Sequence, residues 1–272
     1  TLPVFVPYYF AIFGGACAVI FGKMLYGGLG KNLYNPAVVG KFFVLIFFEK
    51  VFLKFKFSNT NFQILDLKLF RNFLDSSFTR FLDGLILSRS NSIGTFSGMA
   101  LIFGGIYLVI KKRISPSTPL SFFLSSIILS FFVPEISKIP VGEILLVGIF
   151  MVADMPTTPV FLIGKIYFGM MLALVSSILL SQKVQNEVLF YAIIILNSFT
   201  LLINKVLRPV TFGKNLKIEA IKQFLQLIVL TFLIVAATII LINLYNFGLF
   251  KYLIYGYSII MIITAFIFLK ND

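Results

Sequence analysis

The sequence predicts an all-α polytopic membrane protein. Hydrophobic residues make up 59% of the chain, charged residues make up only 12%, and the mean hydropathy is +1.02. The apolar residues form about nine runs of roughly 15 to 22 residues, near the length with which a helix crosses a hydrocarbon core about 30 Å thick. Such runs favour helices, because lipid offers the backbone no hydrogen-bond partners. We expect spans near 4–22, 37–53, 95–110, 119–133, 141–153, 160–181, 187–204, 221–243 and 249–269.

The composition also limits the chemistry that this chain can carry out alone. It contains one cysteine, Cys17, and no histidine. These counts exclude a Cys/His zinc site, an intrachain disulfide, an iron–sulfur cluster held by this chain alone, and general-base chemistry by histidine. We therefore name no catalytic residue and no metal ligand. Any redox chemistry must come from a bound organic cofactor or from partner subunits.

A polar, glycine-rich stretch, GGLGKNLYNPAV at 27–38, interrupts the apolar sequence between the first two predicted spans. Within a bilayer, irregular backbone persists only where protein buries it or a water-filled cavity solvates it. Two interpretations are open. The stretch is either a tight loop between spans or a broken-helix site that faces a substrate, ion or cofactor. Asn32 and Asn35, with Lys31, are its candidate binding residues.

The segment 54–93 is the only stretch long enough to form a small extramembrane element. It mixes aromatic, hydroxyl and charged residues without a clean periodicity. A loop of about 40 residues is uncommon unless it has a function or some structure of its own.

A second interruption follows the short predicted span 141–153, where PTTP at 156–159 separates it from the span 160–181. Asp154 lies beside this break, where a carboxylate is costly unless it is paired, solvated or bound to an ion. Thr157 and Thr158 add hydroxyl oxygens that suit a hard cation. These three residues are candidates for an ion path. The alternative is that Asp154 caps the following half-helix or stabilises the loop.

The charged loops orient the predicted bundle. If Lys111, Lys112 and Arg113 face the cytoplasm, alternation also places the loops of Lys23 and Lys205, and the C-terminus, on that side. The inner side then carries most of the net charge of +13, as the positive-inside rule requires. Membrane orientation thus explains the excess of basic over acidic residues. We expect the lipid bilayer as a partner, and no nucleic acid.

Four ordered blocks resemble a known family. They are GKMLYGGLGKNLYNPAV (22–38), SIGTFSGMALIFGGIYLVIKKRIS (92–115), GIFMVADMPTTPV (148–160) and LNSFTLLINK (196–205). Together they resemble the D subunit of the Rnf complex. The B subunit of the sodium-pumping NADH:quinone oxidoreductase, a related family, shares the first and third patterns.

The resemblance to this RnfD/NqrB family implies a membrane subunit of a redox-driven pump that passes electrons between ferredoxin and NAD and moves Na⁺ or H⁺. The implied fold is a helical bundle of two related halves with broken helices, covering 1–213, while 214–272 form an extension with two further spans. The implied partners are other Rnf-type subunits, including an outer-face flavoprotein and membrane subunits with an iron–sulfur cluster. The implied location is the cytoplasmic membrane of a bacterium or archaeon, with the C-terminus inside.

Members of this family carry FMN on a threonine of an SGAT-like motif in the outer loop, and this sequence departs from that motif. FSNT at 57–60 offers Thr60, and SSFT at 76–79 offers Thr79, but neither fits the pattern. Arg71 and Arg80 could neutralise a flavin phosphate. Three possibilities stay open: FMN attached to one of the two threonines, flavin bound noncovalently, and no flavin at all. A second, noncovalent flavin is also open. An alternative from another class is a cofactor-free solute or ion transporter on the same broken-helix fold.

Overall fold

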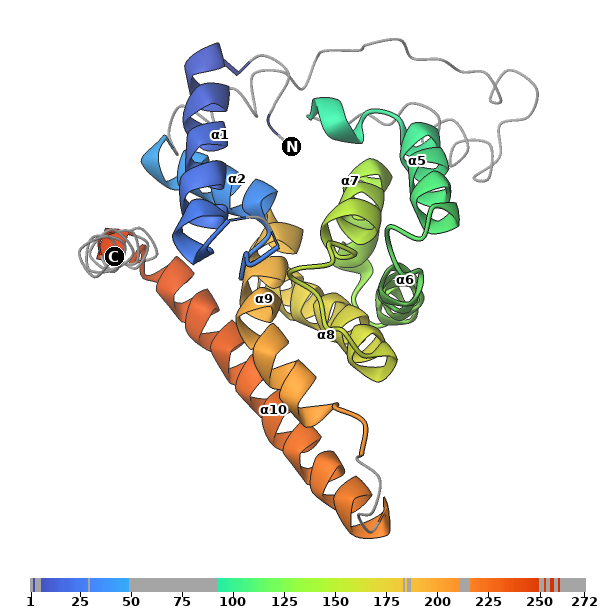
Figure 1. The fold of residues 1–272 in the computed structure, drawn as a ribbon. Helices are drawn as coiled ribbons and strands as arrows, with labels where there is room; N and C mark the ends of the chain where they lie inside the picture. Colours follow the sequence, from blue (N-terminus) through green and yellow to red (C-terminus); the bar gives the residue numbers. More distant parts are fainter. Residues whose placement is uncertain are drawn as a thin grey trace.

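The computed structural model describes residues 6–28, 30–48, 92–182, 187–210 and 216–249, and positions 2, 184, 252, 255, 256 and 259. Its elements are all helical, as predicted (Figure 1). They are α1 (Tyr8–Gly22), η1 (Met24–Tyr26), α2 (Pro36–Phe47), η2 (Ile93–Thr95), α5 (Gly98–Ile110), α6 (Ser117–Ser130), η3 (Pro134–Lys138), α7 (Val141–Leu146), η4 (Val147–Met151), α8 (Leu162–Ser181), α9 (Val188–Val206) and α10 (Leu216–Asn246).

The described helices match the predicted apolar segments, but not all of them are full spans. Four helical stretches are long and apolar enough to cross a membrane: Tyr8–Tyr26, Leu162–Ser181, Val188–Val206 and Ile218–Asn246. The other apolar helices have only 10–17 residues: Pro36–Phe47, Gly98–Ile110, Ser117–Ser130 and Val141–Met151. The ninth predicted span, 249–269, lies almost entirely outside the described residues. The fold class is therefore confirmed, while a total of about nine spans is not.

Small residues bring α1 and α2 into close contact. A Cβ atom added to Gly40 of α2 would lie 2.8 Å from Cβ of Ala18 in α1. At the end of α1, a Cβ on Gly22 would lie 2.9 Å from Cα of Pro36, the first residue of α2. Small residues allow this approach of helices in lipid, where association depends on close packing. The close contacts fix both ends of the stretch that connects α1 to α2.

The α6 and α8 helices also pack backbone to backbone. A Cβ atom on Gly169 of α8 would lie 2.7 Å from the carbonyl oxygen of Thr118 and 2.9 Å from the backbone nitrogen of Phe122. Any larger residue at position 169 would push the two helices apart. This contact fixes α8, which begins just after the second interruption.

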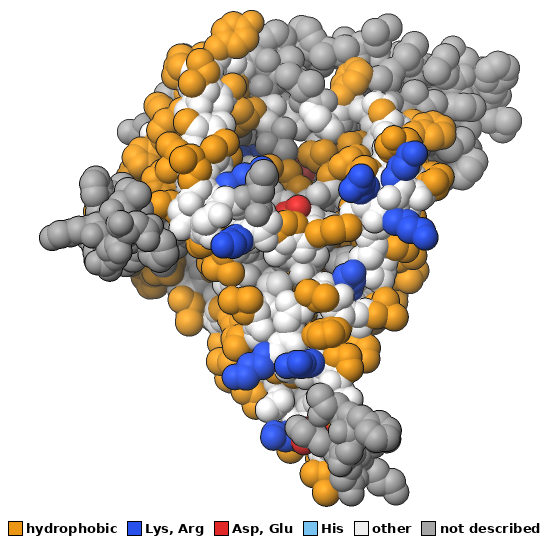
Figure 2. Space-filling model, in the orientation of Figure 1, with side chains coloured by type: hydrophobic (Ala, Val, Ile, Leu, Met, Phe, Trp, Pro, Cys, Tyr) orange, Lys and Arg blue, Asp and Glu red, His pale blue; other side chains and the backbone are white. Residues whose placement is uncertain are grey.

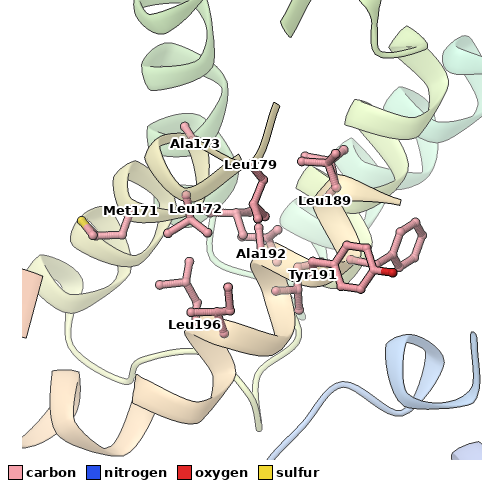
Figure 3. Close-up of a cluster of buried hydrophobic side chains, with 14 of the residues drawn as sticks. Met171, Leu172, Ala173, Leu179, Leu189, Tyr191, Ala192 and Leu196 are labelled. Atoms are coloured by element: carbon pink, nitrogen blue, oxygen red, sulfur yellow. The ribbon is translucent and has the colours of Figure 1, made fainter. Parts of the chain in front are cut away.

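The main hydrophobic core lies around α8 and α9, near the centre of the molecule (Figures 1 and 3). Leu172 and Leu179 of α8 meet Leu189 and Leu196 of α9, and all four side chains are at most 2% exposed. The α10 helix belongs to the same core through its buried residues Leu230, Ile234 and Ile242. The first helix of the C-terminal extension is therefore packed onto the bundle.

The α10 helix has 31 residues, which corresponds to about 46 Å at 1.5 Å per residue. It is longer than the hydrocarbon core, about 30 Å, and it runs past the end of α9 in Figure 1. The basic stretch KIEAIKQFLQ, at 217–226, forms its first turns. On the face shown in Figure 2, hydrophobic side chains cover much of the described surface, with basic side chains between them. Many of the hydrophobic side chains are large and exposed, for example those of Tyr8 and Phe131. Such side chains suit contact with lipid.

Candidate functional site

The first interruption is built on glycines with left-handed backbone conformations. Gly27, Gly28 and Gly30 have φ angles of +96°, +95° and +81°, which residues with a Cβ atom adopt only at a cost. The interruption ends at Asn35. Its Oδ1 atom accepts a hydrogen bond from the backbone N–H of Ala37 at 3.0 Å, which caps α2. A proline follows Asn35 as the first residue of α2, a position where its missing N–H has no consequence.

The second interruption begins with an irregular helical turn. The α7 helix continues into the π turn η4, where the N–H of Val152 donates to the carbonyl oxygen of Val147 at 2.9 Å. Single π turns within helices occur frequently at functional sites. The turn ends at Met151, and ten residues of loop precede Leu162, the first residue of α8.

Asp154 holds this loop together. Thr157 Oγ1 donates to Asp154 Oδ2 at 3.1 Å, and Thr158 Oγ1 donates to the Asp154 carbonyl oxygen at 2.9 Å. The residue that precedes α8, Phe161, provides no side-chain cap. Asp154 therefore stabilises the loop rather than capping the following half-helix. Its carboxylate, with the two hydroxyls, gives the loop a set of oxygen atoms of the kind that hard cations bind.

The two interruptions meet in space, although they lie more than 100 residues apart in sequence. Asn35 Nδ2 donates to the carbonyl oxygen of Met151 at 3.3 Å, so one side chain both caps α2 and contacts the end of the π turn. Lys23, which follows α1, lies close enough to Asp154 to interact with it electrostatically. We use the name polar centre for three segments and the contacts between them. The segments are the first interruption, the π turn, and the loop of the second interruption that follows this turn.

The α9 helix holds both interruptions from the other side. Three hydrogen bonds do so: Tyr34 OH with Ser198 Oγ at 3.0 Å, Thr200 Oγ1 to the Thr157 carbonyl oxygen at 2.9 Å, and Val160 N–H to Asn204 Oδ1 at 2.9 Å. Both interruptions are thus fixed to one helix as well as to each other.

The structure brings part of the predicted site together. Asn32, Asn35, Thr157 and Thr158 are buried in the polar centre, and Asp154 is half-buried there. Four predicted flavin residues lie outside the described residues, and their roles stay predictions: Thr60, Thr79, Arg71 and Arg80.

Sequence reasoning missed the contribution of α9. Ser198, Thr200 and Asn204 lie in the block LNSFTLLINK, which we used only for its family resemblance. The positions 197, 200 and 204 share one helix face, and this spacing of polar residues could have identified Thr200 and Asn204. Asn197 is 1% exposed, and its Nδ2 atom has no hydrogen-bond partner in the described part of the chain.

A buried ion pair joins α2 to the start of α9, and sequence reasoning missed it as well. The Lys41 Nζ atom contacts Glu187 Oε2, and the two side chains are 5% and 8% exposed. The same ammonium lies 3.6 Å from the centroid of the Phe190 ring. Lys41 and Glu187 are 146 positions apart, and no motif connects them.

Comparison with known proteins gives the family. A sequence profile of the NQR2, RnfD, RnfE family matches residues 1–213. The chain belongs to this family. The match contains α1, α2 and α5 to α9, and with them both interruptions and all of their described hydrogen bonds to α9. The family membership confirms the resemblance inferred from the four sequence blocks.

Curated relatives of the family are similar to most of this chain. The D subunit of a proton-translocating ferredoxin:NAD⁺ oxidoreductase complex from Clostridium ljungdahlii is 27% identical over 234 residues, covering 78% of this chain and 71% of the relative. The D subunit of a Na⁺-translocating ferredoxin:NAD⁺ oxidoreductase complex from Acetobacterium woodii is also 27% identical, over 222 residues, covering 78% and 69%. Because these two names differ in the ion, overall identity does not indicate which ion this chain serves.

Proposed function

We propose that this chain is the D-type membrane subunit of an Rnf-type complex, which relays electrons between ferredoxin and NAD and couples this transfer to Na⁺ or H⁺ transport. The observation that carries the proposal is the hydrogen bond between Asn35 and Met151, within a family match that covers 1–213. It joins two interrupted elements of an apolar bundle. Interrupted helices within a membrane protein are typical of sites that hold ions or polar substrates.

In this proposal, the oxygen atoms of the second interruption form part of the ion path. The Asp154 carboxylate and the hydroxyls of Thr157 and Thr158 lie within one loop. Thr157 donates to the carboxylate at 3.1 Å, and Thr158 donates to the backbone carbonyl of Asp154 at 2.9 Å. The Asn197 Nδ2 atom has no partner among the described residues and lies on the face of α9 that binds this loop, so it suits a water molecule that hydrates a passing ion.

Flavin is the proposed electron carrier, with FMN attached in the segment 54–93 at Thr60 or Thr79. Bound flavin would supply the redox chemistry that amino-acid side chains lack. Both polar atoms of Asn35 are engaged by protein partners, so we assign Asn35 to the scaffold of the site. Asn32 remains a candidate for contact with a noncovalent flavin. The proposed location is the cytoplasmic membrane, with 54–93 outside and the C-terminus inside.

The flavin proposal is tested by mass spectrometry of the purified complex. We expect an adduct of FMN mass on a peptide from 54–93, a fluorescent band that survives denaturing electrophoresis, and loss of both in Thr60→Ala or in Thr79→Ala. Wild-type protein without the adduct would exclude covalent flavin. The co-purifying subunits, identified in the same experiment, test the assignment to an Rnf-type complex.

The ion path is tested with Asp154→Asn in the whole complex. We expect the complex to assemble, while ion uptake into inverted vesicles driven by ferredoxin oxidation falls severalfold. A loss of folding yield alone would make Asp154 structural. If the isolated chain instead moves a solute in liposomes and shows no flavin absorbance, the cofactor-free transporter is the better assignment.

A further inference from the structure

The ion pair between Lys41 and Glu187 lies outside the polar centre and has no role in the function proposed so far. Lys41 is in the middle of α2, and Glu187 directly precedes α9. Their surroundings are apolar: Val38, Phe42, Val184 and Val188 are all buried nearby in sequence and belong to one hydrophobic cluster. Two opposite charges therefore contact each other inside the bundle.

Stability does not explain this pair. Removing two charges from water costs about as much as their attraction returns, and apolar residues of similar volume often stabilise a protein equally well or better. Charged residues within membrane helices are expensive and commonly belong to ion or proton pathways. The pair is therefore best explained by a task that requires charge.

Among the described residues, the Lys41 ammonium has favourable partners of two kinds. One is the Glu187 carboxylate, and the other is the face of the Phe190 ring, 3.6 Å from Nζ to the ring centroid. Attraction to an aromatic face stabilises an ammonium, most strongly away from water. The ring can thus retain the ammonium when the carboxylate takes another cation.

The backbone of Glu187 is fixed while its side chain carries the charge. Its φ angle is +60°, a left-handed conformation that a residue with a Cβ atom adopts only at a cost. Its carbonyl oxygen accepts hydrogen bonds from two N–H groups in the first turn of α9, that of Phe190 at 3.0 Å and that of Tyr191 at 3.2 Å. This geometry holds the carboxylate at the N-terminal end of α9, where it faces α2.

The pair and the polar centre share the contact between α2 and α9. Tyr191 packs its ring against Phe42 at 5.3 Å between centroids, next to the pair. Further along α9, Ser198 contacts Tyr34, just before α2 begins. A different face of α9 reaches the second interruption through Thr200 and Asn204. Polar side chains therefore occur along α9 from Glu187 to Asn204.

We propose that the Glu187 carboxylate binds the transported monovalent cation, Na⁺ or H⁺, and that Lys41 is the resident countercharge, which this cation replaces at the carboxylate while the ammonium stays on the Phe190 ring. The inference rests on the proposed function. Binding raises the net charge of the pair from zero to plus one. A low-dielectric interior opposes this change unless a negative charge arrives nearby. Cation uptake is thereby coupled to the arrival of an electron in the complex.

The first test replaces the charges with apolar side chains in the whole complex. In Lys41→Met/Glu187→Leu, we expect assembly and ferredoxin-dependent NAD reduction to continue, while ion uptake per electron falls at least about tenfold. Lys111→Met/Glu135→Gln removes the same two charges outside the pair and should leave uptake unchanged. Normal uptake in the first variant would overturn the proposal. A wild-type complex that neither reduces NAD nor takes up ions would instead overturn the proposed function.

The second test uses the wild-type complex, so it does not depend on the folding of a variant. Dicyclohexylcarbodiimide, an apolar reagent for carboxyl groups, should label the peptide that contains Glu187. Labelling slowed by Na⁺ identifies Na⁺ as the ligand, and labelling that Na⁺ leaves unchanged identifies H⁺. Reaction elsewhere without reaction at Glu187 would overturn the proposal.

Discussion

The two interruptions break apolar helices by different means. The first depends on backbone conformation, because Gly27, Gly28 and Gly30 all have positive φ angles. The second contains no residue with a positive φ angle. It depends on side-chain hydrogen bonds from Thr157 and Thr158 to Asp154.

This difference indicates which interruption is rigid scaffold and which one can carry chemistry. The three glycines that set the first turn have no side chains, whereas the second loop places a carboxylate and two hydroxyls within one short segment. Asn35 connects the two interruptions. Substitutions should therefore mainly reduce stability in the first interruption and mainly reduce function in the second.

The largest expected effect on stability is that of Gly27→Ala/Gly28→Ala. A Cβ at Gly28 would meet no atom within 4 Å, and one at Gly27 would meet only the flexible Lys31 side chain. The cost is therefore conformational, about 1 to 3 kcal/mol for each residue. Equilibrium unfolding in mixed detergent micelles measures it. The control is Gly15→Ala in α1, also with open space around it, which should be neutral or stabilise the helix by about 0.5 to 1 kcal/mol. Equal effects of the two variants would contradict the conformational explanation.

The next largest effect should come from Asn35→Ala. It removes a helix cap worth about 1 kcal/mol and leaves the carbonyl of Met151 without its side-chain donor, at a cost of about 1 to 3 kcal/mol. Asn35→Asp separates the two contributions, because a carboxylate still accepts the Ala37 N–H but cannot donate to Met151. In the same unfolding measurement, the stability of Asn35→Asp should lie between that of the wild type and that of Asn35→Ala. If Asp matches Asn, the contact between the interruptions contributes nothing to stability.

The sequence predicted the parts of this site that depend on neighbouring residues. Apolar runs and polar breaks located the helices and both interruptions, because lipid imposes these patterns locally. The bonds from Asn35 to Met151 and from Lys41 to Glu187 join residues more than 100 positions apart, and no local pattern records such pairs. The packing of α10 in the main core escaped prediction for the same reason: an apolar helix suits lipid and protein equally well.

A smaller effect on stability is expected for Thr158→Val. The change keeps the shape of the side chain and removes the hydrogen bond to the Asp154 carbonyl, which also accepts from the N–H of Thr157 at 3.3 Å. Because that carbonyl keeps a partner, the loss should be about 0.5 to 1.5 kcal/mol. Ion uptake by the complex should fall more than this change in stability suggests. A variant with unchanged uptake would assign the second interruption to the scaffold, like the first.

The smallest effect should follow Ser198→Ala, at most about 0.5 kcal/mol, because an exposed hydrogen bond can be replaced by one to water. The Ser198 hydroxyl also donates to the Ile194 carbonyl of its own helix at 3.0 Å, and it keeps this bond when it gains or loses the Tyr34 hydroxyl as a donor. Thr200→Val is the matched change at the second interruption. It removes a buried bond to Thr157 and should cost more. A reversed order, measured by the same unfolding titration, would mean that α9 holds the glycine-built interruption more tightly than the loop of Asp154. The first interruption would then depend on side chains too, and the distinction between a backbone-built scaffold and a side-chain-built site would fail.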